Sequence, residues 1–233
     1  MRAVNREARR AQSGSLPPAR DQHETAFTRI LRDLVARVPG ARAAALVDVE
    51  GETVDYWSLV PPFDVKVAAA HWRVVVDEMR QRGPLARTTF VAVRAARASY
   101  QVHLLPEGYA LVLVLSRGAG FGGWRRAVAA CSLALAHEAS WSVEDIPSPR
   151  WYWSRVVTDD KRRPIALGSP PNVRSIDVLG TVVSGLERRE RAWRVRVESR
   201  IDVTLVREAG GNWYLDEAAA LPGAPSGLEP QSR

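Results

Sequence analysis

The run YALVLVL, residues Tyr109–Leu115, constrains the fold of this chain more than any other stretch of its sequence. Nearly all of its side chains are apolar, whereas a strand with one solvent-facing side alternates apolar and polar residues. A short continuous apolar run of this kind is typical of a strand buried on both faces. We therefore expect a sheet whose central strand is covered on both sides.

Three amphipathic helices accompany this strand. Apolar residues spaced three and four apart predict a first helix from Asp21 to Val38, which Pro39-Gly40 ends. A second helix is expected over Asp64–Arg82, with Asp64 as its N-cap, and a third over Trp124–Ala139. The strands predicted around them are Ala43–Val49 and Glu52–Leu59, joined by a tight turn at Glu50-Gly51, then Thr88–Ala96, Tyr100–Leu105 and Tyr109–Leu115.

The second helix is apolar over a wider surface than one sheet can bury. Beyond its main apolar stripe it carries Val67, Ala70 and Val74 on a flank. His71 lies between the stripes, and packing or an interface is a more natural role for it than metal binding, because valines occupy the positions three and four residues on. This flank predicts a second packing partner for the helix.

The order helix, two strands, helix, three strands, helix resembles the Roadblock/dynein light-chain family over residues 21 to about 141. The hairpin ARAAALVDVEGETVDYWSL, with its acidic turn from Asp48 to Gly51, is similar to the family's first hairpin. The strand YALVLVLSRG followed by the helix WRRAVAACSLALA is similar to its closing element. The resemblance implies an α+β sandwich, in which helices cover a five-stranded antiparallel sheet.

The remaining sequence predicts a second, all-β unit. Residues 142–150, SVEDIPSPR, read as a linker, and residues 151–217 as a small barrel or sandwich like an SH3-type barrel. We expect Trp151 and Trp153 to share one face and to lie in its core. The polar residues 1–20, with five Arg against one Glu, and the Pro-containing residues 218–233 are expected to be disordered tails. The strand candidates are Trp151–Val157, Ile176–Val183, Trp193–Val197 and Ile201–Val206.

Composition argues against several classes of protein. No apolar run is long enough to span a bilayer and the N-terminus lacks a secretory h-region, so we expect a cytoplasmic location. A single cysteine, Cys131, excludes an internal disulfide framework. The net charge of +7 is weak evidence for nucleic acid, because only Lys66 and Lys161 of the 33 basic residues are Lys, a skew that a GC-rich genome produces by itself.

No catalytic or cofactor site can be assembled from the sequence. Gly118–Gly123 satisfies G-x-G-x-x-G after a buried strand, but no second parallel strand follows to complete a dinucleotide fold. Cys131 lies on the inner stripe of the third helix, and the adjacent acidic pairs Glu144-Asp145 and Asp159-Asp160 point their side chains apart. We therefore expect a non-catalytic protein that binds neither a cofactor nor a metal.

A basic, aromatic stretch in the β-unit leaves nucleic-acid binding as a minor alternative. The segment LERRERAWRVRVESR offers Trp193, Arg194 and Arg196 as binding candidates. Interleaved glutamates and the alternation of apolar with Arg residues favour instead a half-buried strand with a charge-mixed outer face.

The family resemblance implies an association module. Roadblock-type domains form dimers through the second helix and the third strand, either with a second copy or with a related Roadblock-type subunit, and bacterial members bind or regulate small Ras-like GTPases. Because such activators remodel the GTPase's own catalytic residues, no arginine finger is implied here. The alternative is a GTPase-independent scaffold that links protein assemblies. The implied dimer-interface residues are Val67, Ala70, His71, Val74, Phe90, Ala92 and Arg94.

Overall fold

The computed structural model describes residues 18–120, 124–146, 150–198 and 200–216 of the 233-residue chain. Most of the two expected tails lies outside the described residues, as do 147–149 of the expected linker and 121–123 of the glycine-rich run.

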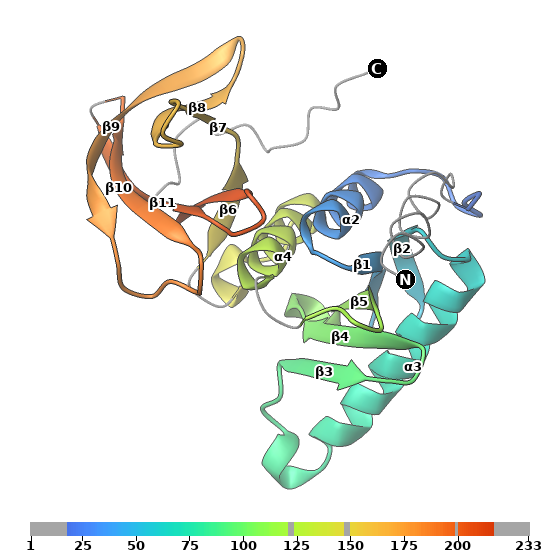
Figure 1. The fold of residues 1–233 in the computed structure, drawn as a ribbon. Helices are drawn as coiled ribbons and strands as arrows, with labels where there is room; N and C mark the ends of the chain where they lie inside the picture. The colour runs from blue at the N-terminus through green and yellow to red at the C-terminus, as the bar shows by residue number, and fades with distance from the viewer. Residues whose placement is uncertain (1–17, 121–123, 147–149, 199, 217–233) are drawn as a thin grey trace, which may run out of the picture.

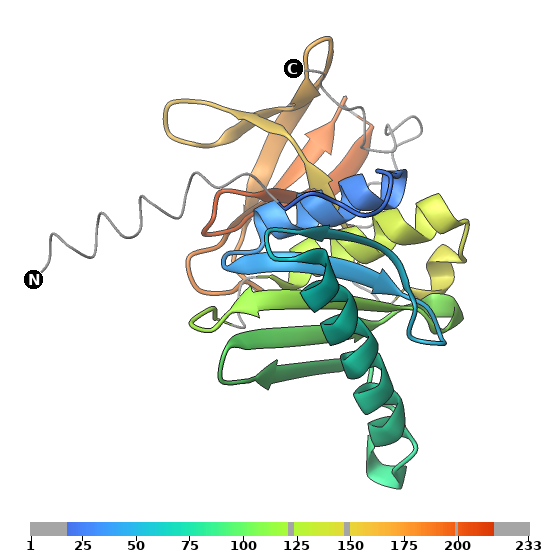
Figure 2. The same cartoon turned by 90° about the vertical axis from the view of Figure 1, so that its right-hand side faces the viewer.

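The N-terminal half is an antiparallel five-stranded sheet between helices (Figure 1). Helix α3 (Pro62–Arg80) covers one face, and α2 (Ala26–Arg37) and α4 (Arg125–Ala139) cover the other (Figure 2). This arrangement confirms the α+β fold class. The strands, which we call sheet A, are β1 (Ala41–Val47), β2 (Thr53–Ser58), β3 (Phe90–Arg94), β4 (Ala98–Leu104) and β5 (Ala110–Ser116), in the order β2-β1-β5-β4-β3.

Strand β5 is buried on both faces, as its sequence predicts. Leu111, Leu113 and Leu115 point toward α2 and α4, and all three are at most 1% exposed. On the opposite face Val112 and Val114 pack with the residues under α3. The apolar run therefore holds the two helix layers together.

Two helix starts differ from the prediction. Helix α2 begins at Ala26, because Thr25 caps it in a reciprocal capping box with Thr28. Helix α3 begins at Pro62 with Pro61 as its N-cap, so the prediction that Asp64 caps this helix is wrong. Proline is well suited to the first helical position because its φ is already helical and it has no N–H to satisfy. Asp64 lies instead in the first turn.

The C-terminal part is a curled, antiparallel seven-stranded sheet, which we call the half-barrel, and it confirms the barrel-like prediction. The sequence indicated neither β8 nor β12, and the single strand expected over Trp151–Val157 is bent at Arg155 into β6 and β7, the two edges of the sheet. The strands are β6 (Trp151–Ser154), β7 (Val156–Thr158), β8 (Pro164–Ser169), β9 (Asn172–Val182), β10 (Arg191–Val197), β11 (Ile201–Arg207) and β12 (Trp213–Asp216).

The half-barrel packs against the outer side of α2 and α4. The prediction that Trp151 and Trp153 lie in the half-barrel's own core is wrong. Both pack against the apolar cluster around α2 and α4, which Tyr214 also joins. Tyr152, between them, points into the half-barrel. Alternation along β6 thus fills two cores at once. Helix α4 is consequently buried almost all round.

Candidate interaction surfaces

The solvent-facing side of α3 carries large apolar side chains. Phe63 is 74% exposed, Val67 51% and Val74 52%, while Ala70 between them is half-buried and His71 is exposed. The residues of the sheet side, Val65, Ala69 and Val76, are at most 1% exposed. The flank that the sequence singled out is therefore a continuous apolar strip on the surface of the molecule.

A buried arginine fixes α3 to the sheet beneath it. Arg73 is 4% exposed and donates from Nε to Asp77 Oδ2 at 2.7 Å, one turn along the same helix. Its Nη1 donates to the carbonyl of Gly108, in the turn between β4 and β5. Because a hydrogen-bonded guanidinium spans helix and turn, α3 presents its apolar strip in a fixed orientation.

Strand β3 is an open edge of sheet A. It pairs with β4 on one side, and no other strand of the described residues pairs with its outer side. The other edge, β2, differs because the guanidinium of Arg20 donates to the carbonyl of Tyr56 there. An unpaired edge is a template for pairing with another chain. Of the two edges of sheet A, β3 is the one that offers such a template.

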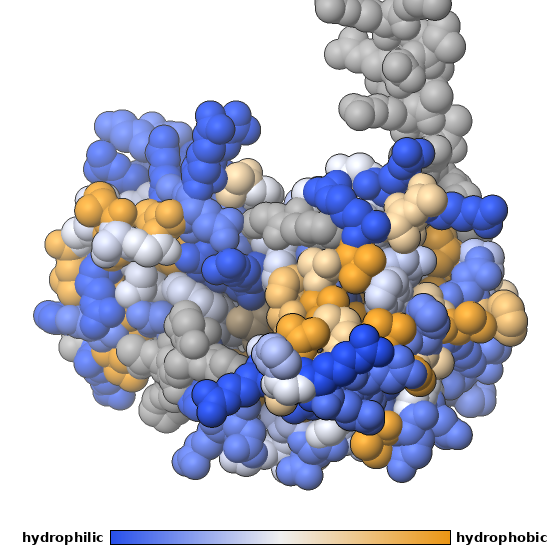
Figure 3. Space-filling view, turned by 90° about the horizontal axis from the view of Figure 1, so that it is seen from below, coloured by the Kyte–Doolittle hydropathy of each residue, from blue (hydrophilic) through white to orange (hydrophobic). Residues whose placement is uncertain are grey.

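The side chains of β3 divide between the two faces of the sheet. Val91 packs under α3, whereas Phe90, Ala92 and Arg94 are exposed and lie on the face of α2 and α4. The candidate residues of α3 and β3 therefore flank the edge from opposite faces, and a partner that adds to β3 would meet both sets. Figure 3 shows apolar side chains gathered on the side of the molecule where β3 and the C-terminal end of α3 lie.

An aromatic cluster that the sequence did not indicate packs against β3 on the face of α2 and α4. Phe90 stacks on His103 with ring centroids 4.6 Å apart, and Trp124 lies 5.1 Å from each of them. Burial lowers the pKa of His103 to about 3, so the imidazole is neutral near pH 7. The cluster ties the edge strand to β4 and to the start of α4.

The described residues contain no group of three or more His, Cys, Asp or Glu side chains that could hold a metal ion. His71 lies edge-on to Trp72, with ring centroids 5.4 Å apart. Burial raises the pKa of the Cys131 thiol to about 12, which keeps it protonated and unreactive. No helix among the described residues is both long and apolar enough to cross a membrane.

The glycine-rich run has no close packing to explain its glycines. A Cβ atom added to Gly118 or Gly120 would meet no other atom within 4 Å. In a dinucleotide fingerprint, glycines are needed where backbone and ligand or helix approach closely. The described half of the run offers no such approach, and the rest lies outside the described residues.

The β-unit candidates are placed as in a half-buried strand. Trp193 is 6% exposed and stacks on Trp213 inside the half-barrel, with ring centroids 5.2 Å apart. Arg196 Nε lies 2.6 Å from Asp202 Oδ1, and Arg194 Nη1 lies 3.7 Å from Asp216 Oδ2. The indole is thus hidden from a ligand, and neighbouring carboxylates neutralise both arginines.

Comparison with known proteins gives matches among solved structures. No family profile and no curated protein matches the sequence. The solved structures similar to the chain are Roadblock/LC7 domains. One is a Roadblock/LC7 domain from Streptomyces avermitilis, with 18% sequence identity and a TM-score of 0.44; the match covers 48% of this chain and 96% of that chain. Another is the gliding protein MglB from Thermus thermophilus, with 21% identity and a TM-score of 0.44, where the match covers 54% of this chain and 98% of that chain. A third is MglC from Myxococcus xanthus, with 20% identity and a TM-score of 0.39, where the match covers 49% of this chain and 99% of that chain. The C-terminal part of this chain is unmatched.

Proposed function

We propose that this chain is a non-catalytic, dimeric adaptor that binds and regulates a small Ras-like GTPase in the cytoplasm of a bacterium. Residues 21–141 are the dimerisation domain and residues 151–217 a β-domain that supplies a second contact. The observation that carries the proposal is the apolar strip of α3 beside the open edge β3.

The occupant of this surface is a second copy of the chain. Burial of apolar side chains stabilises association by about 25 cal/mol per Å² of apolar area. In a dimer with two-fold symmetry the same apolar strip is buried on both copies, so the buried area is doubled. Charge supports an antiparallel pairing of the two α3 helices, because Asp64 lies in the first turn and Arg80 in the last turn. Antiparallel helices bring these opposite charges together, whereas parallel helices would align like charges.

Support for a GTPase partner comes from the family resemblance of the first hairpin and of the closing strand and helix. The half-barrel covers α2 and α4, so a GTPase that contacts sheet A approaches it from the other side, where the paired α3 helices of the two copies lie.

The test is affinity capture from the native lysate with the tagged full chain, divided between GDP and a non-hydrolysable GTP analogue. We expect one small GTPase to be enriched in the analogue arm, and the captured GTPase then serves in a hydrolysis assay. Partners that bind equally in both arms, with no GTPase among them, would favour the scaffold. Nuclease-sensitive material on the beads would favour nucleic-acid binding.

A matched pair of variants makes this test specific. Val67→Glu with Val74→Glu places two charges in the apolar strip that joins the two copies, and we expect it to reduce capture of the GTPase because the GTPase binds the dimer. Val183→Glu is the control, since Val183 is 88% exposed and lies after β9, away from α3. Equal loss of capture in both variants would contradict the assignment of the surface.

A further inference from the structure

The junction between the half-barrel and the helix layer contains a buried polar cluster. It is formed where the turn between β11 and β12 and the loop between β9 and β10 meet the C-terminal end of α2 and the start of α4. A cavity of about 180 Å³ opens beside it. Its lining includes Arg37, Glu187, Arg188, Glu190, Glu208 and Asn212.

The strongly buried cation of the cluster is already paired. The guanidinium of Arg126, on α4, donates from Nη1 to Glu190 Oε1, and the two side chains are 10% and 3% exposed. Arg126 also lies 4.6 Å from the centre of the Trp151 ring. The other carboxylate oxygen of Glu190 accepts from the backbone N–H of Glu187 at 2.8 Å. The Arg126–Glu190 pair therefore spans the junction from α4 to the half-barrel.

Glu208, in the turn between β11 and β12, has no such partner. It is 6% exposed, and no cation of the described residues lies within ion-pair distance of its carboxyl group. Burial raises the pKa of Glu208 to about 7, and the negative charges of Glu190 and Glu187 add to this, whereas Arg126 and the Asn212 side chain oppose it. Near pH 7 this carboxyl group thus exists in both protonation states.

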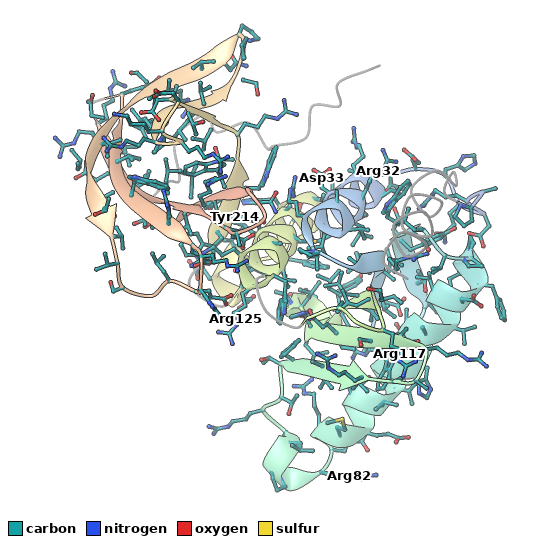
Figure 4. All side chains as sticks on the ribbon, in the orientation of Figure 1. Arg32, Asp33, Arg82, Arg117, Arg125 and Tyr214 are labelled. Atoms are coloured by element: carbon teal, nitrogen blue, oxygen red, sulfur yellow. The ribbon has the colours of Figure 1, made fainter. Side chains whose placement is uncertain are left out.

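The remaining groups around Glu208 offer a new anion little support. Arg37 of α2 is engaged elsewhere, because its Nη2 lies 2.9 Å from Asp33 Oδ2 and its guanidinium lies 4.2 Å from the Trp153 ring centre. The Arg188 side chain is on an exposed loop. Tyr214, fully buried on β12, has a hydroxyl with no hydrogen-bond partner among the described residues, and Figure 4 shows it on the side of the half-barrel toward α2 and α4.

We infer that the docking of the half-barrel on α2 and α4 is controlled by the proton on Glu208. With the proton in place, the cluster holds one carboxylate, Glu190, and one buried cation, Arg126. When the proton leaves to solvent through the adjacent cavity, two buried carboxylates compete for that cation. An unpaired buried charge is strongly unfavourable, so the contact weakens and the turn moves toward solvent.

The consequence is a regulated apolar surface. Opening of the junction uncovers Trp151 and Trp153 of β6, which are partly buried against the helix layer in the docked state, and the outer side of α4, which the half-barrel covers. Neutral pH lies within the range where the proton exchanges, so a modest change in pH shifts the population of docked molecules.

Hydrogen–deuterium exchange of the full chain at pH 5.5 and pH 8 tests this inference. Wild type and Glu208→Gln are compared at each pH. The wild-type exchange rate divided by the exchange rate of the variant cancels the intrinsic pH dependence of exchange. For peptides of α4, β6 and β12 we expect that ratio to rise by about tenfold between the two pH values. Peptides of β1 and β5, far from the junction, should give a constant ratio.

Two further measurements make the test decisive. Glu138→Gln removes an exposed carboxylate from α4 itself, and we expect it to behave as wild type. Carbon-13 NMR of the wild-type glutamate carboxyls should show one group that titrates near pH 7, assigned by its loss in Glu208→Gln, and this titration does not depend on how well the variant folds. An exchange ratio that does not change with pH, or a Glu208 carboxyl that titrates near its ordinary value, would overturn the inference.

Discussion

The carboxylate of Asp55 on β2 lies 2.8 Å from the guanidinium of Arg20, a residue that the sequence placed in a disordered tail. The same carboxylate accepts from Thr25 Oγ1 at 2.5 Å and from Thr28 Oγ1 at 2.7 Å. Asp55 is 2% exposed. One buried side chain thus joins the segment before α2, the first turn of α2 and the edge strand β2.

Replacement of Asp55 by Asn should destabilise the fold. Removing the charge leaves Arg20 without its buried partner, and loss of one member of a buried pair costs about 3 to 5 kcal/mol. Urea unfolding measures this loss. The matched control is Asp202→Asn, which breaks the exposed Arg196–Asp202 pair and should change stability little, because solvent screens an exposed ion pair. Equal effects would contradict the central role of Asp55.

Stability should fall on both sides of a maximum in mildly acidic solution. Burial alone would raise the pKa of Asp55, but hydrogen bonds from Thr25, Thr28 and Arg20 outweigh it and lower the pKa. The Asp55 carboxylate therefore contributes to the stability of the fold at pH values above the ordinary pKa of Asp, about 3.9. This contribution is lost as the pH falls through the lower pKa that Asp55 has in the folded protein. The raised pKa of Glu208 acts in the opposite sense, because the folded protein binds this proton more tightly than the unfolded chain does. The stability that this proton contributes is therefore lost as the pH rises from about 4.5 to about 7.

Urea midpoints between pH 3 and pH 8 test this profile. We expect Asp55→Asn to flatten the acid side and Glu208→Gln the neutral side, each without effect on the other. A wild-type midpoint that stays constant from pH 5 to pH 8 would show that Glu208 titrates normally.

Trp153→Ala should loosen the junction more than it harms either sheet. Trp153 packs against the apolar cluster around α2 and α4, and Arg37 lies over its ring. Truncation of a partly buried Trp removes about 2 kcal/mol of packing, less than the cost for a fully buried one. Limited proteolysis should then cleave first between residues 139 and 151, where the junction begins. Val157→Ala, on the exposed side of β7, should leave the cleavage pattern unchanged.

Local sequence patterns sufficed to predict sheet A and the helices that cover it, because the spacing of apolar residues within each element indicates its secondary structure. The apolar run of β5 and the 3.6-residue spacing in α2 and α4 are independent of distant contacts. The strip of Val67, Ala70 and Val74 was visible for the same reason, since a helix that is apolar beyond its sheet side has few alternatives.

Long-range choices were not visible in the sequence. Alternation shows that Trp151 and Trp153 share a face, but it cannot tell which of two cores that face enters. The Arg126–Glu190 pair joins residues 64 positions apart, and the Asp55 cluster joins residues up to 35 positions apart. Strands β8 and β12 are short or contain glycine and polar residues, so their period is weak.

The mass of the purified chain in solution tests the central claim most directly. Sedimentation equilibrium or light scattering should give twice the 25.7 kDa chain mass for wild type and for the Val183→Glu control. For Val67→Glu with Val74→Glu we expect the single-chain mass with unchanged circular dichroism. A monomeric wild type, or a dimer that this double variant leaves intact, would contradict association through α3 and β3.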